Sequence, residues 1–97
     1  MLKISTEELL GEVLLVLEGS LSGPWVPELE RAWQPVSREP LLRTLRVDLS
    51  GVTFVSEQGR SLLERMCAAG VELFSSDLQT RALCEELSQK YREIGNP

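Results

Sequence analysis

The sequence has 97 residues, enough for one domain with a single modest core and too few for a separate catalytic domain. Its formal net charge of −5 opposes binding to nucleic-acid backbones and to anionic membrane surfaces. The chain contains no histidine, which removes the commonest general base and the commonest metal ligand. These features favour a non-enzymatic domain that needs neither a cofactor nor a metal.

The two cysteines, Cys67 and Cys84, lack the spacing of a metal site and are too few for a disulfide framework. Both fall in helical patterns, so we expect small core residues in a reducing cytoplasm. The first residues alternate like a strand rather than a signal peptide. The longest apolar run, residues 13–17, is too short to span a membrane. The sequence thus predicts a cytoplasmic protein without membrane insertion.

The first half of the chain predicts two strands and a helix. Leu2 and Ile4 begin a short edge strand, and a turn follows over residues 7–11. Residues 13–17 are apolar throughout, which is typical of a strand buried on both faces. Residues 19–24 form a loop of Gly, Ser and Pro, and the regular helix starts at about Pro27.

The predicted first helix contains residues 28–33, with Leu29 and Trp33 on its inner face. Two prolines make residues 34–40 a predicted linker. Trp25 lies where the preceding loop meets this helix. It either packs in the core or stands half exposed as an anchor for a partner.

The second half predicts two more strands and two more helices. Leu45, Val47 and Leu49 alternate with polar residues, as in a strand, and residues 50–57 are predicted as a loop. A helix follows over about residues 58–69, ended by Gly70, and a short strand covers residues 71–74. The last helix is predicted to begin with a capping box of Ser76 and Gln79, and to end near residue 91.

This order of elements predicts a single α/β domain over residues 1–97. The sheet is mixed and roughly four-stranded, with about three helices mostly on one face. Its first strand is antiparallel to the second, and right-handed crossovers make the other pairs parallel.

Three loops follow the carboxyl ends of the predicted strands, at residues 19–24, 50–58 and 75–77. All three are rich in hydroxyls and lead into helix N-termini, which favour negative charge. They suit a carboxylate or a phosphorylated side chain. Alternatively, the serines are ordinary caps and turn residues.

Residues 48–59, with the sequence DLSGVTFVSEQG, resemble the signature segment of STAS domains, the anti-sigma-factor antagonist family. Residues 16–21, VLEGSL, and residues 70–74, GVELF, are similar to the family's flanking segments. The resemblance covers roughly residues 2–90 and points to a short, stand-alone bacterial subgroup. It implies the STAS fold, no catalytic activity and a role in transcription regulation by partner switching.

In such a switch, the unphosphorylated protein binds an anti-sigma factor that is also a serine kinase. Phosphorylation of a serine just before the second helix adds about −1.5 to −2 charge and releases the partner. This chain has Ser56 at the family's aspartate and Glu57 at the acceptor position. A serine kinase therefore cannot phosphorylate this position, because glutamate has no hydroxyl. Ser56 is a weak alternative acceptor and otherwise an N-cap.

Glu57 allows three interpretations. It is a permanent, partial mimic of the phosphorylated state, a sign that the phosphorylation switch is lost, or simply an acidic residue favoured in a helix's first turn. A partner would bind the second helix and its neighbouring loops. The predicted contacts are Leu21, Ser22, Trp25, Val55, Ser56, Glu57, Gln58, Gly59 and Arg60.

The resemblance leaves two kinds of protein partner open. One is the anti-sigma factor kinase; the other is the cytosolic ATPase of a lipid-type ABC transporter, which needs no phosphorylation. We expect this chain to be a monomer or a weak dimer. An enzyme or nucleotide binder is disfavoured, because neither a Walker-type nor a Rossmann-type glycine loop is present.

Overall fold

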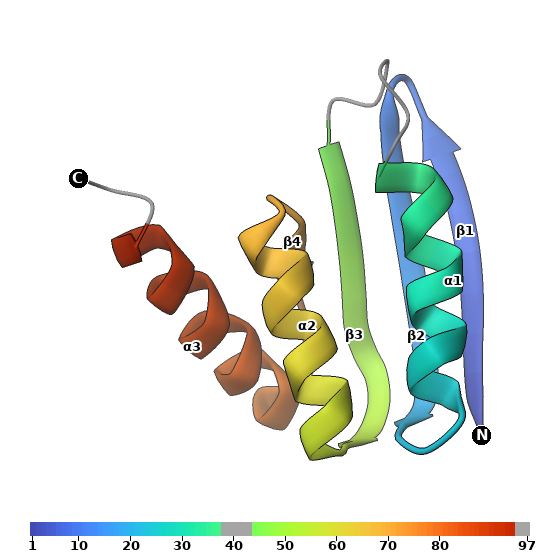
Figure 1. The fold of residues 1–97 in the computed structure, drawn as a ribbon, viewed down its shortest axis with the longest axis vertical. Helices are drawn as coiled ribbons and strands as arrows, with labels where there is room; N and C mark the ends of the chain where they lie inside the picture. The colour runs from blue at the N-terminus through green and yellow to red at the C-terminus, as the bar shows by residue number, and fades with distance from the viewer. Residues whose placement is uncertain (38–43, 95–97) are drawn as a thin grey trace.

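The computed structural model describes residues 1–37 and 44–94. The observed order of strands and helices is the predicted one (Figure 1). The elements are β1 (Leu2–Leu9), β2 (Glu12–Leu21), α1 (Trp25–Ser37), β3 (Thr44–Val55), α2 (Glu57–Ala68), β4 (Glu72–Phe74) and α3 (Leu78–Ile94).

The sheet has the spatial order β1-β2-β3-β4, so each strand lies beside its neighbour in the chain. The β1–β2 pair is antiparallel, whereas β2–β3 and β3–β4 are parallel. The mixed four-stranded sheet predicted from the sequence is confirmed. Parallel pairing brings the carboxyl ends of β2 and β3 to the same end of the molecule.

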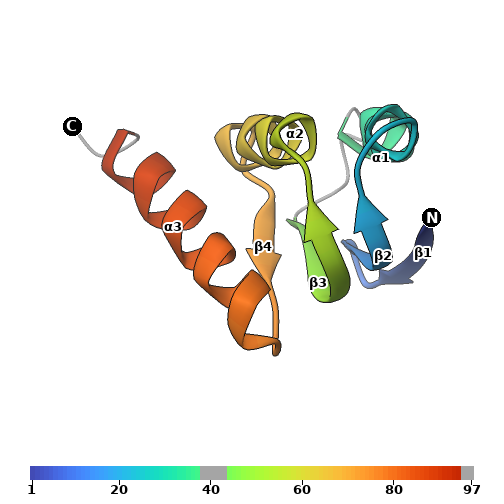
Figure 2. The ribbon, with the colours of Figure 1, turned by 90° about the horizontal axis from the view of Figure 1, so that it is seen from below.

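Helices α1 and α2 cover one face of the sheet, and α3 runs obliquely beyond β4 (Figure 2). The core lies under α1 and α2. Accordingly β2 buries alternate residues: Val13, Leu15 and Leu17 are buried, whereas Leu14 and Val16 are only partly buried. The predicted burial of residues 13–17 on both faces is therefore wrong, because the second face has no comparable cover.

The β1–β2 hairpin is tighter and longer than predicted. Glu7 and Glu8 belong to β1, and the turn consists of Leu10 and Gly11 alone, with φ of 45° and 85°. Because β1 is an edge strand with exposed positions, it accommodates the two glutamates that suggested a turn. Leu10 is fully exposed in a left-handed conformation that favours glycine or asparagine.

Helix α1 begins before the predicted start and continues through the predicted linker. It starts at Trp25, whose N–H donates to the Ser22 carbonyl at 3.1 Å, and includes Pro35. Its inner residues pack on the core, and that packing outweighs the one hydrogen bond that Pro35 cannot donate. The predicted linker is therefore helical to residue 37, and its residues 38–40 lie outside the described part of the chain.

Strand β3 continues through residues 50–55, which the sequence predicted as a loop. The β2–β3 register shifts between Val16 and Glu18 and again between Gly19 and Ser20, which breaks the simple alternation of side chains. Beyond the shifts the strands pair again, up to Leu21 opposite Val55. The added length carries Phe54 and Val55 to the end of the sheet.

The last elements follow the prediction closely. Helix α2 and strand β4 match within a residue or two, and α3 extends to Ile94. The capping box of Ser76 and Gln79 is wrong, because Asp77 caps α3: its Oδ2 accepts from the Thr80 N–H at 3.2 Å. Leu87 is buried and Leu83 packs against the core. The side chain of Tyr91 lies outside the described part.

Both cysteines are free, and both belong to the packed interior as predicted. Cys84 is buried in α3, and Cys67 is partly buried in α2. Desolvation raises the pKa of each thiol to about 11, so neither forms a reactive thiolate near neutral pH.

Candidate functional site

The end of β2 and the start of α2 are in direct backbone contact. The Ser56 N–H donates to the Leu21 carbonyl at 3.0 Å. One turn further, a Cβ on Gly59 would stand 2.6 Å from that same carbonyl oxygen. Only glycine permits this approach, so Gly59 fixes where α2 starts relative to β2. Gly59 and Leu21 are both buried, and thus position the site rather than face a partner.

Ser56 is the N-cap of α2. Its backbone is extended, with φ −75° and ψ 172°, and its Oγ accepts from the Gly59 N–H at 3.1 Å. The hydroxyl satisfies one of the N–H groups that a helix leaves unpaired at its start. The N-cap interpretation of Ser56 is therefore confirmed by its geometry.

Glu57 is the first residue of α2, and Gln58 follows it; both are exposed. The Glu57 carboxylate lies at the positive end of the helix dipole, where an acidic residue stabilises a helix. The Glu57 charge is thus presented to solvent beside the ends of β2 and β3.

Arg60 is held by contacts within the protein. Its guanidinium forms ion pairs with Glu86 on α3 at 2.6 Å and with Glu64 on α2 at 3.6 Å. Lys90 joins the same group through Glu64 at 3.7 Å. The hydrogen bond to Glu86 is the main cause that raises the pKa of Arg60. Arg60 therefore links α2 to α3, and a partner's carboxylate would have to compete with Glu86.

The β2–α1 loop is held by its own hydrogen bonds. Ser22 and Ser20 pair through their hydroxyls at 2.8 Å, and Ser22 is partly buried. Trp25 is also partly buried and packs against the core. This matches the core alternative, with part of the side chain still accessible.

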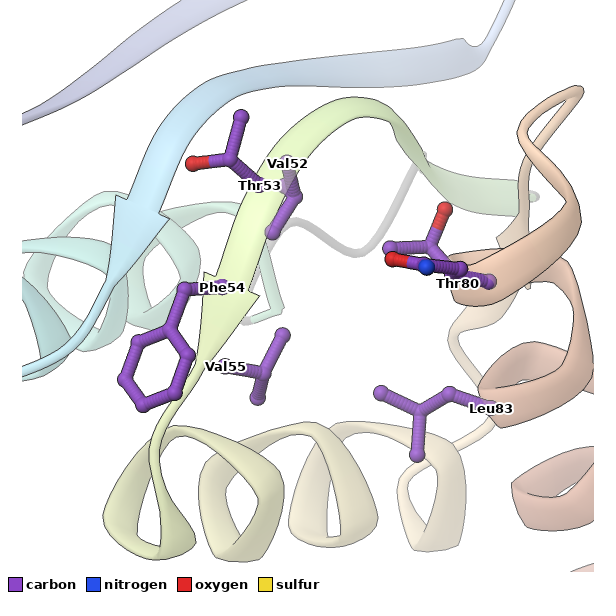
Figure 3. Close-up of a pocket in the computed structure, with 7 residues that line it drawn as sticks. Val52, Thr53, Phe54, Val55, Thr80 and Leu83 are labelled. Carbon is purple, nitrogen blue, oxygen red and sulfur yellow. The ribbon is translucent and has the colours of Figure 1, made fainter.

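The end of β3 presents an apolar surface. Phe54 is 57% exposed, and Val55 beside it is half-buried. A shallow cavity of about 250 Å³ opens between this end of β3 and α3 (Figure 3). Its lining is Val52, Thr53, Phe54, Val55, Gln79, Thr80 and Leu83.

The hydroxyls of the three loops do not converge on one point. Ser50 accepts from the N–H of Ser76 at 2.9 Å, which ties β3 to the β4–α3 loop. Ser75 instead pairs with the Thr80 hydroxyl in the first turn of α3 at 2.6 Å. Ser56 caps α2, and the other serines connect segments by hydrogen bonds. This agrees with the alternative that they are ordinary cap and turn residues. They do not form a common anion site.

Two kinds of site are missing from the part of the chain that the structure describes, a metal-ligand group and a membrane-spanning helix. Residues 1–37 and 44–94 contain no group of three acidic or cysteine side chains that could hold a metal ion. Across the same ranges, no helix is long and apolar enough to cross a membrane.

The candidate site is a surface near the end of the sheet. We call it the α2 surface and define it by its accessible residues Trp25, Phe54, Val55, Glu57 and Gln58. The sequence prediction omits Phe54 from this surface because it makes residues 50–57 a loop, where an alternation of apolar and polar residues has no structural meaning. It also missed Gln79, Thr80 and Leu83, which only the packing of α3 brings to the cavity.

Comparison with known proteins supports the fold. No protein-family description and no curated protein sequence matches this chain. Among solved structures, the anti-sigma factor antagonist SpoIIAA in its unphosphorylated form is similar with a TM-score of 0.64 at 14% identity. The match covers 98% of this chain and 100% of that one. The predicted STAS fold is thus confirmed over the length of the domain.

A second similar structure is the crystal structure of Mglu, with a TM-score of 0.58 at 23% identity. That match covers 75% of this chain but 19% of the other. This chain therefore spans about a fifth of the length of Mglu.

Proposed function

We propose that this protein is a non-catalytic regulator that acts by binding another protein through the α2 surface, in the manner of an anti-sigma factor antagonist. The main support is the similarity to SpoIIAA over nearly the whole of both chains. The α2 surface adds to it, because it combines exposed apolar area at Phe54 with a charge at Glu57. Apolar anchors beside polar groups are typical of protein interfaces.

Glu57 removes the usual release step from this interface. A carboxylate has no hydroxyl to phosphorylate, and it carries a single negative charge without the three acceptor oxygens of a phosphate. Under the proposal, the affinity for the partner is set by the sequence instead of by a kinase. Ser56 remains a weak alternative acceptor, since its Oγ accepts the Gly59 N–H in capping α2 and phosphorylation there would disturb that cap.

Two kinds of partner fit such a surface. The first is an anti-sigma factor of the serine-kinase type, with Glu57 weakening or tuning the complex. The second is the cytosolic ATPase of a lipid-type ABC transporter, on which this domain would be an accessory subunit. The missing acceptor hydroxyl favours the second, since a permanent subunit needs no release.

The test starts by capturing the tagged protein with its partner and identifying that partner by mass spectrometry. Affinity is then measured by calorimetry for wild type, Phe54→Ser and Glu57→Gln. Phe54 is exposed, so its replacement leaves the fold intact and is expected to weaken binding at least tenfold. An unchanged affinity for Phe54→Ser would contradict the proposed surface. Glu8→Gln, an exposed substitution in β1, is the control for a general charge effect.

The Glu57 variants decide its role separately. If Glu57 mimics a phosphate, Glu57→Gln and Glu57→Ser both bind the partner more tightly than wild type. If the charge is neutral for binding, Glu57→Gln has the wild-type affinity, and the mimic interpretation is rejected. Glu57→Ser also restores an acceptor, so incubation with a kinase-type partner and ATP distinguishes the two partner classes.

A further inference from the structure

Strand β1 is an edge of the sheet, and among the described residues no strand lies on its outer side (Figure 1). It is long and regular: Leu2–Leu9 pair with β2 without any register shift. It contains no proline. Bulges, prolines and a short length, three of the features that protect a sheet edge from pairing, are therefore missing, and charged side chains are the protection that remains.

The hydrogen bonds to β2 determine which backbone groups of β1 remain unpaired. Ser20 N–H donates to the Met1 carbonyl at 3.0 Å, which makes that pair hydrogen-bonded. In an antiparallel ladder bonded pairs alternate with unbonded ones, so Lys3, Ser5 and Glu7 also bond to β2. The N–H and C=O groups that point away from the sheet belong to Leu2, Ile4, Thr6 and Glu8.

The side chains of β1 follow the same alternation. Leu2 and Ile4 face the core, as does Leu17 opposite Ile4. Lys3 therefore lies on the sheet face away from α1 and α2, together with Ser5 and Glu7. There Lys3 has only a long, exposed ion pair with Glu18, at 3.8 Å. Glu7 has no ion pair with any of the described residues.

We propose that β1 is a homodimer interface, in which the β1 edges of two copies pair antiparallel about a two-fold axis at Ser5. In this register Ile4 and Thr6 of one copy face Thr6 and Ile4 of the other. These are the residues with outward backbone groups, so each such pair exchanges two hydrogen bonds. The two sheets join into one continuous sheet of both copies.

The charges select this register. With the axis at Ser5, each Lys3 lies opposite Glu7 of the second copy, in the unbonded positions where side chains are closest. Moving the axis to Ile4 places Lys3 opposite Ser5. Moving it to Thr6 places Lys3 opposite Leu9, and moving it to Glu7 places two glutamates opposite each other. Only the axis at Ser5 forms two opposite-charge pairs.

A charge exchange tests both the interface and its register. Sedimentation velocity over about 10 µM to 1 mM, a range that covers weak association, measures the dimer fraction. Lys3→Glu and Glu7→Lys alone each place like charges opposite one another and are expected to weaken the dimer at least tenfold. Lys3→Glu combined with Glu7→Lys restores opposite charges and is expected to recover the wild-type dimer constant. Glu85→Lys on α3 is the control for net charge.

A proline variant tests the backbone pairing. Thr6→Pro removes an outward N–H without breaking a bond to β2, so the monomer keeps its fold and the dimer is lost. Circular dichroism and urea unfolding check that fold. A wild-type protein that stays monomeric at 1 mM overturns the proposal. So does a dimer that neither charge reversal weakens, whatever the result with Thr6→Pro.

Discussion

The Leu21 carbonyl oxygen accepts a hydrogen bond from the Ser56 N–H at 3.0 Å. The same oxygen lies 2.6 Å from where a Cβ on Gly59 would stand. One backbone atom at the end of β2 thus determines the position of the whole first turn of α2. The α2 surface depends on this contact, because Glu57 and Gln58 lie between Ser56 and Gly59 in the same turn.

Gly59→Ala should disrupt this contact. The new methyl would overlap the Leu21 carbonyl, and overpacking of this kind destabilises proteins by about 1–3 kcal/mol. Because the overlap at 2.6 Å is with a backbone atom, we expect a loss in the upper part of that range, which exceeds the gain of about 1 kcal/mol from replacing a helical glycine by alanine. Urea unfolding should show a lower free energy of unfolding. Ser61→Ala, at an exposed position of the same helix, is the control and should not destabilise. A fully stable Gly59→Ala protein would mean that α2 can shift freely.

Ser56→Ala should destabilise the protein by about 1 kcal/mol, the usual effect of removing an N-cap side chain. Ser56→Asp should keep most of the stability, because a carboxylate caps a helix equally well. Thermal or urea unfolding of the two variants measures the difference. Equal stabilities for the alanine and aspartate variants would argue against capping as the role of Ser56.

Leu10→Asn should stabilise the protein by about 1 kcal/mol. A non-glycine residue in the left-handed conformation is disfavoured by about 1–2 kcal/mol, and asparagine tolerates that conformation better than leucine. The exposed leucine contributes no packing to offset this strain. Urea unfolding compares Leu10→Asn with Leu9→Asn, which changes exposure without the unusual φ. Equal effects of both substitutions would show that the backbone strain is small.

The raised pKa values of the two cysteine thiols should make the free energy of unfolding depend on pH. Their pKa is about 11 in the folded protein against 9.0 for an ordinary thiol. Between pH 9 and 11 the unfolded chain therefore binds fewer thiol protons than the folded one. The free energy of unfolding falls as pH rises through this window. Below pH 9 the thiols contribute no pH dependence.

Urea unfolding at pH 8, 9 and 10 measures this effect, and Cys67→Ala should reduce the slope above pH 9. Alkylation by iodoacetamide at pH 8 gives a second readout. Both thiols should react much more slowly in the folded protein than in urea. Equal rates in the two states would contradict the raised pKa.

The sequence predicted the order of elements and the pairing of the strands, because each main strand has an apolar pattern and each helix an apolar face. It also placed the start of α2 within one residue, since serine is a typical N-cap residue and Ser56 occupies that position. Local chemistry determines these features, so a single sequence reveals them.

Features that depend on contacts between distant residues could not be predicted. The extension of β3 to Val55 rests on pairing with β2 across two register shifts. The burial of Thr80 and the cavity beside Phe54 need the packing of α3. The ion pair of Arg60 with Glu86 joins two helices, whereas the sequence predicted Arg60 only as a contact for a partner.

The strand order β1-β2-β3-β4 also has a consequence for how the chain folds. Each strand pair is formed by a hairpin or by one strand–helix–strand unit. A strand can therefore pair with the preceding strand before any later strand has been synthesised. Of these units, the β1–β2 hairpin has the shortest loop and is entropically the easiest to close. The sheet can grow one strand at a time from the β1–β2 hairpin, in the order in which a ribosome releases the chain.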